Sequence, residues 1–396
     1  MNLEKHPYFT KYVDPESGVE SYLLTEKIAG MYQHFYFSES SVTSDGKYLW
    51  IRCTNPPSWF STLAVVSLDA ENPFIRHFPQ AGILGGCPRI TPEEDGVYYP
   101  NDDSIYKVDL EGNVTRVFRV PAQFLHGRSV HGLSTHCTVS CDGKYMILDM
   151  MTGGAYYVLR VELATGEYRV LNNFGRCYDH AQFSPTKPDL FLIDQDWWRD
   201  YRSGEYFCID NRIWLMNTEG TRFEPLIANA FYGRSGCEIC HDFWSEDGHL
   251  CWVDYNLGTY ECDVDTREVT HVWKRPVCHC HTTADRTLWV GDQTPYNWKN
   301  KPCKVLFYDR KTNREIPIFS AMPEPPVERG QYHVDPHPQF VCGGEYVVAT
   351  ATVGVETATV SITPVKPLLE KCRQTGREIL EAPPVPGPSE WILNRF

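Results

Sequence analysis

Four polar side chains alternate along the segment Gln331–Phe340, which reads Gln-Tyr-His-Val-Asp-Pro-His-Pro-Gln-Phe. They are His333, Asp335, His337 and Gln339. In an extended chain, every second side chain projects to the same side, so two imidazoles, a carboxylate and an amide would share one face. Such a set predicts a site for a metal ion or a charged ligand. A Pro-rich surface turn with solvated histidines is the alternative, because proline is usually exposed and histidine often is.

Two prolines limit the element that carries these side chains. Pro336 and Pro338 exclude a helix interior and fit poorly in the hydrogen-bonded ladder of a central strand. We therefore expect an extended segment that leads into a strand whose regular part begins at Phe340. The polar groups would then lie at the mouth of a strand.

The composition predicts an all-β protein. Of the 396 residues, 42% are apolar and 13% aromatic, and 28 Gly and 28 Pro accompany 23 Tyr and 11 Trp. Aromatic residues favour strands, while Gly and Pro favour turns. The formal net charge of -14 argues against nucleic acid and against an anionic membrane as partners, because both require a cationic surface.

Neither a signal peptide nor a membrane span is recognisable, since no apolar run approaches ~18 residues. We therefore expect a cytoplasmic location. The 15 cysteines are expected to be reduced thiols that fill small core positions. Cys237 and Cys240 form a Cys-x-x-Cys pair, but no second pair at finger spacing accompanies them, which argues against zinc.

An imperfect repeat of about 45 residues runs along the chain, and such periods indicate repeat architectures. Each copy has a first strand, a Ser/Thr-x-Asp-Gly-like turn, an apolar strand, a strand ending in Asp or Asn, a second turn, and a last strand with Arg, Val or Phe. The turns of the seven copies fall at Asp45-Gly46, Asp95-Gly96, Asp142-Gly143, Pro185-Thr186, Asp247-Gly248, Asp285 and Gly343-Gly344.

Seven four-stranded units predict a seven-bladed β-propeller that forms one domain over residues 1–396. The seven blades would occupy residues 33–365 approximately, with a partly helical or extended tail at 366–396. The last copy is short by one strand, and residues 20–25 can supply it and close the ring. Two stacked β-sandwiches are the alternative fold.

Histidines recur a few residues before the turns. Since the first strand of each propeller blade lines the central channel, these side chains would converge on one polar site. Packing alone explains them poorly, because every buried imidazole needs a partner. The set consists of His34, His136, His180, His241, His279 and His337.

Several of these segments, taken together, resemble oligogalacturonate lyases, a family of cytoplasmic seven-bladed propellers that cleave short pectin fragments. The resemblance is clear in blades four to seven and only general in blades one to three. The matching segments are His180–Leu190, Arg212–Gly220, His241–Gly248, His279–Asp292 and His337–Phe340.

The resemblance implies β-elimination from a uronate. His241 matches the family's base, and Arg212 matches its essential arginine, which can pair with a carboxylate through two N–H groups. A neutral imidazole is a suitable base near neutral pH. The substrate would be an anionic oligosaccharide.

The family also holds a divalent, manganese-like cation through three histidines and a glutamine. His279 and His337 match two of these histidines. The chain departs from the family at the other ligands, for which four nearby residues are open: His333, Gln331, Asp335 and Gln339.

Further substrate contacts are predicted around this site. The insertion Gln195–Asp210 brings aromatic rings and cations next to blade four, which suits an anionic sugar; a surface loop packed on itself is the alternative. The predicted substrate-binding residues are His180, His136, Trp198, Arg202 and Tyr332. A non-catalytic interaction scaffold, or a hydrolase or epimerase acting on a related sugar acid, remain the alternative functions.

Overall fold

The computed structural model describes residues 1–125, 127–196, 198–199, 206–207, 211–227, 239–295 and 297–380. By internal contacts the chain divides into two compact units. We call Met1–Gly82, Trp252–Glu261 and Thr270–Phe396 the first unit, and Ile83–Cys251 and Cys262–Val269 the second unit. The prediction of a single domain stays a prediction.

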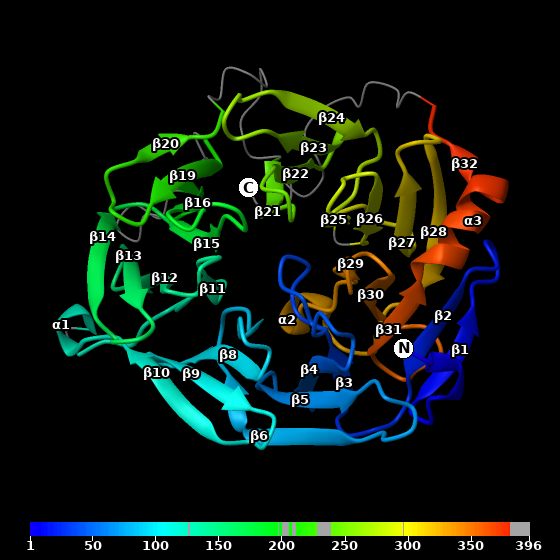
Figure 1. Cartoon of the computed structure of the whole chain (residues 1–396), viewed down its shortest axis with the longest axis horizontal. Helices are drawn as coiled ribbons and strands as arrows, with labels where there is room; N and C mark the ends of the chain where they lie inside the picture. Colours follow the sequence, from blue (N-terminus) through cyan, green and yellow to red (C-terminus); the bar gives the residue numbers. More distant parts are fainter. Residues whose placement is uncertain are drawn as a thin grey trace. The chain divides into compact units, whose positions relative to one another are not determined.

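Seven antiparallel sheets of four or five strands follow one another along the described ranges (Figure 1). This is the architecture of a seven-bladed β-propeller, so the all-β prediction is confirmed. In each of these sheets the first four strands are hydrogen-bonded neighbours in the order that the repeat predicted, with Glu20–Leu24 as the fourth strand of the last blade.

The sheets of the first unit are blades one, six and seven. Blade one contains β3 (Met31–Gln33), β4 (Tyr48–Thr54), β5 (Ser61–Ser67) and β6 (Ile75–Ile83). Blade six contains β25 (Cys280–Thr282), β26 (Leu288–Gln293), β27 (Cys303–Asp309), β28 (Arg314–Met322) and β32 (Arg377–Glu378). Blade seven contains β29 (Gln339–Val341), β30 (Tyr346–Ala351), β31 (Thr359–Pro364), β2 (Glu20–Leu24) and β1 (Phe9–Val13).

Blades two, three and four belong to the second unit. Blade two contains β7 (Arg89–Ile90), β8 (Gly96–Asn101), β9 (Ser104–Asp109) and β10 (Val114–Arg119). Blade three contains β11 (Thr138–Val139), β12 (Tyr145–Thr152), β13 (Ala155–Glu162) and β14 (Tyr168–Phe174). Blade four contains β15 (Tyr178–Phe183), β16 (Leu190–Gln195), β19 (Ile213–Asn217) and β20 (Phe223–Pro225).

Blade five, one short two-stranded sheet and four helices complete the described elements. Blade five contains β21 (Ile239–Trp244), β22 (Leu250–Asp254), β23 (Gly258–Cys262) and β24 (Val269–Trp273), and β17 (Trp198–Arg199) pairs with β18 (Tyr206–Phe207). The helices are η1 (Leu3–Lys5), α1 (Ala122–Leu125), α2 (Arg329–Tyr332) and α3 (Val365–Thr375). No helix in the described part of the chain is long and apolar enough to cross a membrane.

The N-terminal segment completes the last blade. In the register of β2 against β31, Tyr22 lies opposite Ile362 and Leu23 opposite Ser361. The prediction that residues 20–25 close the sheet is therefore confirmed, and β1 adds a fifth strand that the repeat did not reveal. The tail beyond residue 365 begins with α3, as the expectation of a partly helical tail allowed.

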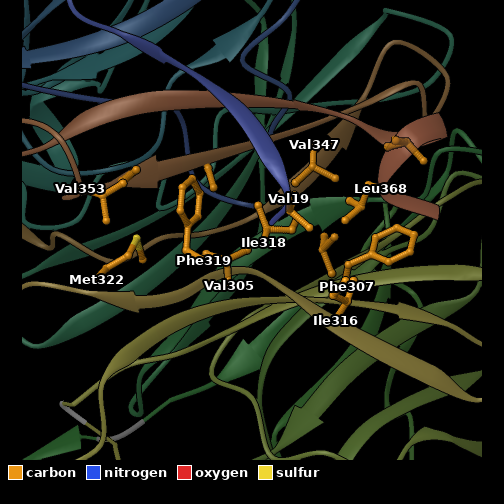
Figure 2. Packing of buried hydrophobic residues seen from close by; sticks show 14 of the residues in the cluster. Val19, Val305, Phe307, Ile316, Ile318, Phe319, Met322, Val347, Val353 and Leu368 are labelled. Carbon is orange, nitrogen blue, oxygen red and sulfur yellow. The ribbon is translucent and has the colours of Figure 1, made fainter. Parts of the chain in front are cut away.

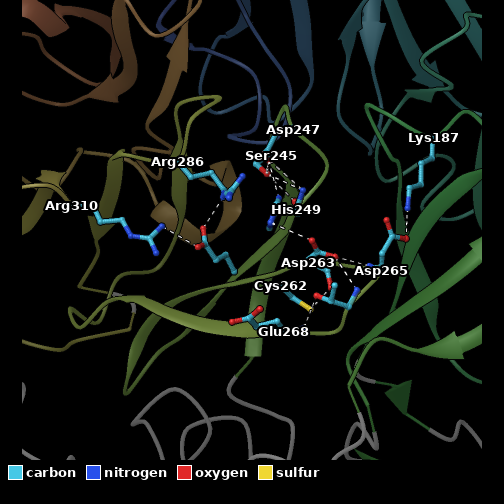
Figure 3. A network of polar contacts seen from close by, with 12 residues as sticks. Lys187, Ser245, Asp247, His249, Cys262, Asp263, Asp265, Glu268, Arg286 and Arg310 are labelled. Carbon is cyan, nitrogen blue, oxygen red and sulfur yellow. Dashed lines mark hydrogen bonds and ion pairs between the residues drawn. The ribbon is translucent and has the colours of Figure 1, made fainter.

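The repeated turns have a common chemistry. In blade five, the Ser245 hydroxyl donates to the Asp247 carboxylate at 2.7 Å, and Gly248 has a φ of 89°, which glycine adopts most easily (Figure 3). The same hydroxyl-to-carboxylate bond closes the turns at 43–45 and 140–142. Because this turn chemistry is local, the sequence reveals the blade period.

Blades six and seven of the first unit share an apolar core with α3. Phe307, Ile318 and Phe319 are fully buried and pack with Val19 and Leu368 of the chain's two ends (Figure 2). Burial of a side chain of this size contributes about 1.5–3 kcal/mol. The closing strand and α3 are therefore held mainly by hydrophobic packing.

Candidate metal centre and polar network

Equivalent positions in the blades follow from their turns. In six blades, the residue before the turn donates its N–H to a carbonyl at the start of the second strand, and we take this residue as the reference position. In the seventh blade the reference position is Val341, which lies opposite Tyr346. The residues four positions earlier are Glu39, Cys87, His136, His180, His241, His279 and His337. Five predicted histidines therefore occupy equivalent positions, whereas in blade one the position belongs to Glu39 and the prediction for His34 is wrong.

His34 has a packing role instead. It is buried, its Nε2 lies 2.9 Å from the Pro336 carbonyl oxygen, and its Nδ1 lies 3.1 Å from the Gln339 amide nitrogen. Burial lowers the pKa of His34 to about 4, although the Pro336 carbonyl opposes this shift. A neutral His34 thus holds the segment that leads into β29.

Three histidines of the first unit form a candidate metal centre. Nitrogen atoms of His279, His333 and His337 all lie within 4.8 Å of one another. The ring centroids of His279 and His337 are 4.2 Å apart, and those of His333 and His337 are 4.8 Å apart. His279 and His337 are buried, while the His333 side chain is 56% exposed. His333 is therefore the residue that the structure groups with His279 and His337, and its role as a metal ligand stays a prediction.

Asp292, at the end of β26, orients this trio. Its Oδ2 lies 3.0 Å from His279 Nδ1 and accepts the His337 N–H at 3.0 Å, and its Oδ1 accepts the His279 N–H at 2.9 Å. A carboxylate on one ring nitrogen fixes the tautomer of His279. The other nitrogen, Nε2, lies 3.9 Å from the Cys278 Sγ and is the atom through which His279 would bind a metal. Asp292 directly follows the strand that the repeat predicted at 288–291, and its contact with blade seven was not visible in the sequence.

Aromatic rings cover the trio. The Tyr36 ring lies 4.8 Å from that of His337 and 5.7 Å from that of His279, and the Phe37 ring lies 5.3 Å from His279. Burial lowers the pKa of His333, with the Asp335 carboxylate opposing the shift. Low pKa values suit metal binding, because only neutral imidazole is a ligand.

The other three predicted ligands have different surroundings. Asp335 Oδ2 lies 3.6 Å from His333 Nε2, and Asp335 is not among the three clustered groups. Gln339 is buried, and its amide nitrogen is used by His34, so only its oxygen remains for a metal. Gln331 lies exposed on α2. These three residues stay open as ligands.

A dense network of charged groups surrounds Arg212 in the second unit. Its Nη2 lies 2.8 Å from Asp194 Oδ2, its Nη1 lies 2.8 Å from Asp196 Oδ1, and its Nε lies 3.5 Å from Asp242 Oδ1. Burial disfavours the charged Arg212, but Asp194 and Asp196 outweigh it and raise its pKa. The guanidinium is thus already paired with protein carboxylates, which the sequence did not indicate.

Two acid groups next to Arg212 are buried. The side chains of Asp194 and Asp242 are 1% and 0% exposed. Burial raises the pKa of Asp194 well above its usual range, the Arg212 cation lowers it, and the neighbouring Asp242 carboxyl raises it further. Asp194 is thus a buried acid whose charge Arg212 favours and Asp242 disfavours.

His180 belongs to the same network. Its Nδ1 lies 2.6 Å from Asp179 Oδ1. Burial alone would lower the pKa of His180, but the Asp179 carboxylate raises it to about 9. By contrast, burial lowers the pKa of His136 well below its usual value, and the charge of His180 lowers it further; the two rings are 5.6 Å apart. One of these neighbours is therefore a cation at neutral pH and the other is neutral.

Asp179, His180 and Asp196 also have ligand atoms close enough for a metal ion. However, Asp179 is paired with His180, and Asp196 is paired with Arg212. We therefore interpret this group as an ion-pair network.

Four histidines have left-handed backbones. The φ angles are 57° for His180, 53° for His241, 49° for His333 and 45° for His337. In blade four the register of β15 against β16 shifts between Asp179 and Gln182, as at a β-bulge. Bulges and positive φ values redirect side chains and concentrate next to functional sites.

The predicted substrate contacts are only partly described. Arg202 lies outside the described residues, and so does the side chain of Trp198. Tyr332 is buried in an apolar cluster with Met31, Val334 and Ala358, which is a packing environment, and its predicted role as a sugar contact stays a prediction. The functional candidates that the sequence missed are Asp179, Asp194, Asp196, Asp242 and Asp292.

The chain is thus a seven-bladed β-propeller that carries a three-histidine cluster and a buried arginine. No family model and no curated protein sequence matches the chain. An oligogalacturonate lyase in complex with manganese is similar in structure, with a TM-score of 0.72, 19% identity, and 90% of this chain and 96% of that chain covered. An oligogalacturonate lyase from Vibrio parahaemolyticus has a TM-score of 0.73 and 20% identity, with the same coverage. At such identity the similarity establishes the fold.

Proposed function

We propose that this chain is a metal-assisted lyase that cleaves uronate-containing oligosaccharides by β-elimination, acting in the cytoplasm on short anionic fragments. The observation that carries the proposal is the trio His279, His333 and His337, whose first member is oriented by the buried Asp292. It occurs in a fold similar to that of oligogalacturonate lyases.

The residues present fit a divalent transition metal. His279, His333 and His337 would hold it, with an oxygen of Gln339, Gln331 or Asp335 as a further ligand. Imidazole suits zinc, iron and nickel, whereas manganese favours oxygen ligands, so the fourth ligand bears on which metal binds. Manganese is our first candidate, because a similar structure contains it. When bound, the metal would act as a Lewis acid toward a substrate oxygen.

Elimination requires a base for the proton at C5 and a cation for the negative charge that develops on the carboxylate. His241 is the proposed base, at the position in β21 that is equivalent to His279 in blade six. Arg212 is the proposed cation. Among the described residues, two of its five N–H groups form 2.8 Å contacts with carboxylates, and we propose that further donors bind the substrate.

His136, Trp198 and Arg202 remain proposed substrate contacts. The chain carries a formal net charge of -14, so local cations must overcome the overall field to bind an anion. Electrostatic attraction to this protein is therefore expected to come from the immediate site.

The test is to incubate the purified, metal-loaded protein with oligogalacturonides and follow the ultraviolet absorbance of the unsaturated uronate product. A steady rise that chelation abolishes is the expected result. A hydrolase or an epimerase would change the sugar without creating the conjugated double bond, and an interaction scaffold would leave it unchanged. Either outcome would contradict the proposed reaction.

A further inference from the structure

We propose that His180 is the general acid of this lyase, delivering a proton to the departing glycosidic oxygen, and that Asp179 is its positioning residue. The inference rests on the proposed function and adds to it, because β-elimination needs a proton for the leaving oxygen as well as a base for C5.

Within the described ranges of the chain, the hydrogen bond of His180 uses one ring nitrogen, Nδ1, and we assign the other nitrogen to the substrate. Nδ1 is held by Asp179 Oδ1 at 2.6 Å, and the Cys177 thiol donates to the other oxygen of that carboxylate at 3.3 Å. The proton on Nε2 is therefore the one that can be transferred. Because 26% of the His180 side chain is exposed, a substrate can reach it.

His180 and the proposed base occupy matching places in neighbouring blades. Both lie four residues before a turn, with φ values of 57° for His180 and 53° for His241. Their strands are tied together, because Gln182 Nε2 donates to the Asp242 carbonyl at 2.9 Å and Trp244 Nε1 donates to the Gln182 carbonyl at 2.9 Å. A base and an acid on adjacent inner strands can act on adjacent atoms of one sugar.

The surroundings keep His180 protonated. Burial and the Arg212 cation lower its pKa, Asp179 and Asp196 raise it, and the result is a pKa of about 9. The adjacent His136 is neutral, and burial raises the pKa of the nearby Asp149 carboxyl to about 6, with the Asp179 charge adding to the shift. An imidazolium that persists above neutral pH is charged and ready to donate at the pH where a neutral imidazole is an effective base.

The proposed step balances. Neutral His241 takes the C5 proton, the C5–H electron pair forms the C4–C5 double bond, and the C4–O bond breaks. The glycosidic oxygen takes the electron pair of that bond and the Nε2 proton of His180. His180 then regains a proton from water, and His241 releases one.

The experiment compares two substrates that differ in their need for an acid. One is an oligogalacturonide, and the other is a galacturonide with a dinitrophenoxy group at C4, which departs without protonation. We expect His180→Ala to lower kcat on the oligogalacturonide by about 10²- to 10⁴-fold. On the activated substrate we expect the variant to stay within a few-fold of the parent.

His249 provides a matched control in the same unit. It too is paired with a carboxylate, since its Nδ1 lies 3.2 Å from Asp247 Oδ1, and its side chain is 24% exposed, but it lies directly after the turn of blade five (Figure 3). His249→Ala is expected to retain the rates of the parent on both substrates. His180→Gln is measured in parallel, because it preserves volume and polarity if the alanine variant unfolds.

Asp179→Asn separates positioning from a structural role. Loss of the carboxylate lowers the pKa of His180, so the alkaline limb of the kcat profile should move to lower pH. Equal losses on both substrates, or a limb that does not move, would overturn the assignment of His180. If the parent cleaves neither substrate, the proposed function itself fails, which is a distinct outcome from a cleaving parent with an unaffected His180→Ala.

Discussion

The first unit contains the histidine trio, and the second unit contains the Arg212 network. In both regions a histidine occupies the equivalent blade position, but the groups that contact it differ. His279 and His180 each have a carboxylate on Nδ1, from Asp292 and Asp179 respectively. Asp292 also accepts two main-chain N–H bonds, whereas Asp179, as far as the described residues go, also accepts the Cys177 thiol. The propeller repeats the position of a histidine, and the neighbouring groups determine its chemistry.

The two regions also differ in charge. In the trio, burial lowers the pKa of His333, which favours the neutral ligand form. In the network, Asp179 raises the pKa of His180 to about 9 despite burial. The trio is suited to bind a metal cation. The network already contains two protein cations, His180 and Arg212, which are paired with carboxylates. Six variants test this contrast.

His241→Ala is expected to have the largest effect. Removal of a general base lowers turnover by about 10²- to 10⁴-fold. Because His241 is only partly buried, the fold should survive, which the thermal unfolding curve would show. Near-parental turnover in the purified variant would remove His241 from the chemical step.

Arg212→Ala should destabilise the second unit. It leaves Asp194 and Asp242 buried beside each other without their cation, and breaking a buried ion pair costs about 3–5 kcal/mol. The free energy of unfolding from urea titrations measures this loss.

Arg212→Lys distinguishes the two roles of Arg212. Lysine keeps the charge but lacks the planar fork, so we expect most of the stability to return while kcat remains low. Parental kinetics in the lysine variant would show that charge alone is sufficient.

Asp292→Asn and Asp179→Asn compare the two carboxylates directly. Loss of Asp292 should weaken metal binding by about 10- to 100-fold, because the orientation of His279 is lost. Loss of Asp179 should leave metal content unchanged. Titration of the apoprotein with manganese measures both affinities, and equal affinities in the two variants would refute the assignment of the trio as the metal centre.

The smallest effect concerns stability against pH. The pKa of His180 is about 9 in the fold and about 6.5 in the unfolded chain, so its pairing stabilises the fold fully below pH 6.5. This contribution declines as the pH rises through 9. His180→Gln should therefore flatten the decline in the free energy of unfolding between pH 6.5 and 9. An unchanged slope in urea titrations would contradict the raised pKa.

The sequence predicted the blades well because their signals are local. Turns such as Ser245–Gly248 combine a hydroxyl, a carboxylate and a glycine within four residues, so the period is visible without contacts. The same local alignment failed in blade one, where His34 was assigned a position that belongs to Glu39. An insertion of a few residues before the turn shifts the position, and only the pairing of β3 with β4 reveals the shift.

The sequence by itself determined the seven repeats, the closing strand β2 and the histidines that recur before the turns. Only the tertiary structure decided which histidine completes the trio, which packs, and which carries charge. The physical reason is that ionisation and ligation depend on groups far apart in the chain. Asp292 binds the His337 N–H 45 residues away, and Gln339 contacts His34 across 305 residues. A local sequence pattern cannot reveal contacts between residues so far apart in the chain. Each pKa is set by burial and by the nearest charges, and both depend on such contacts.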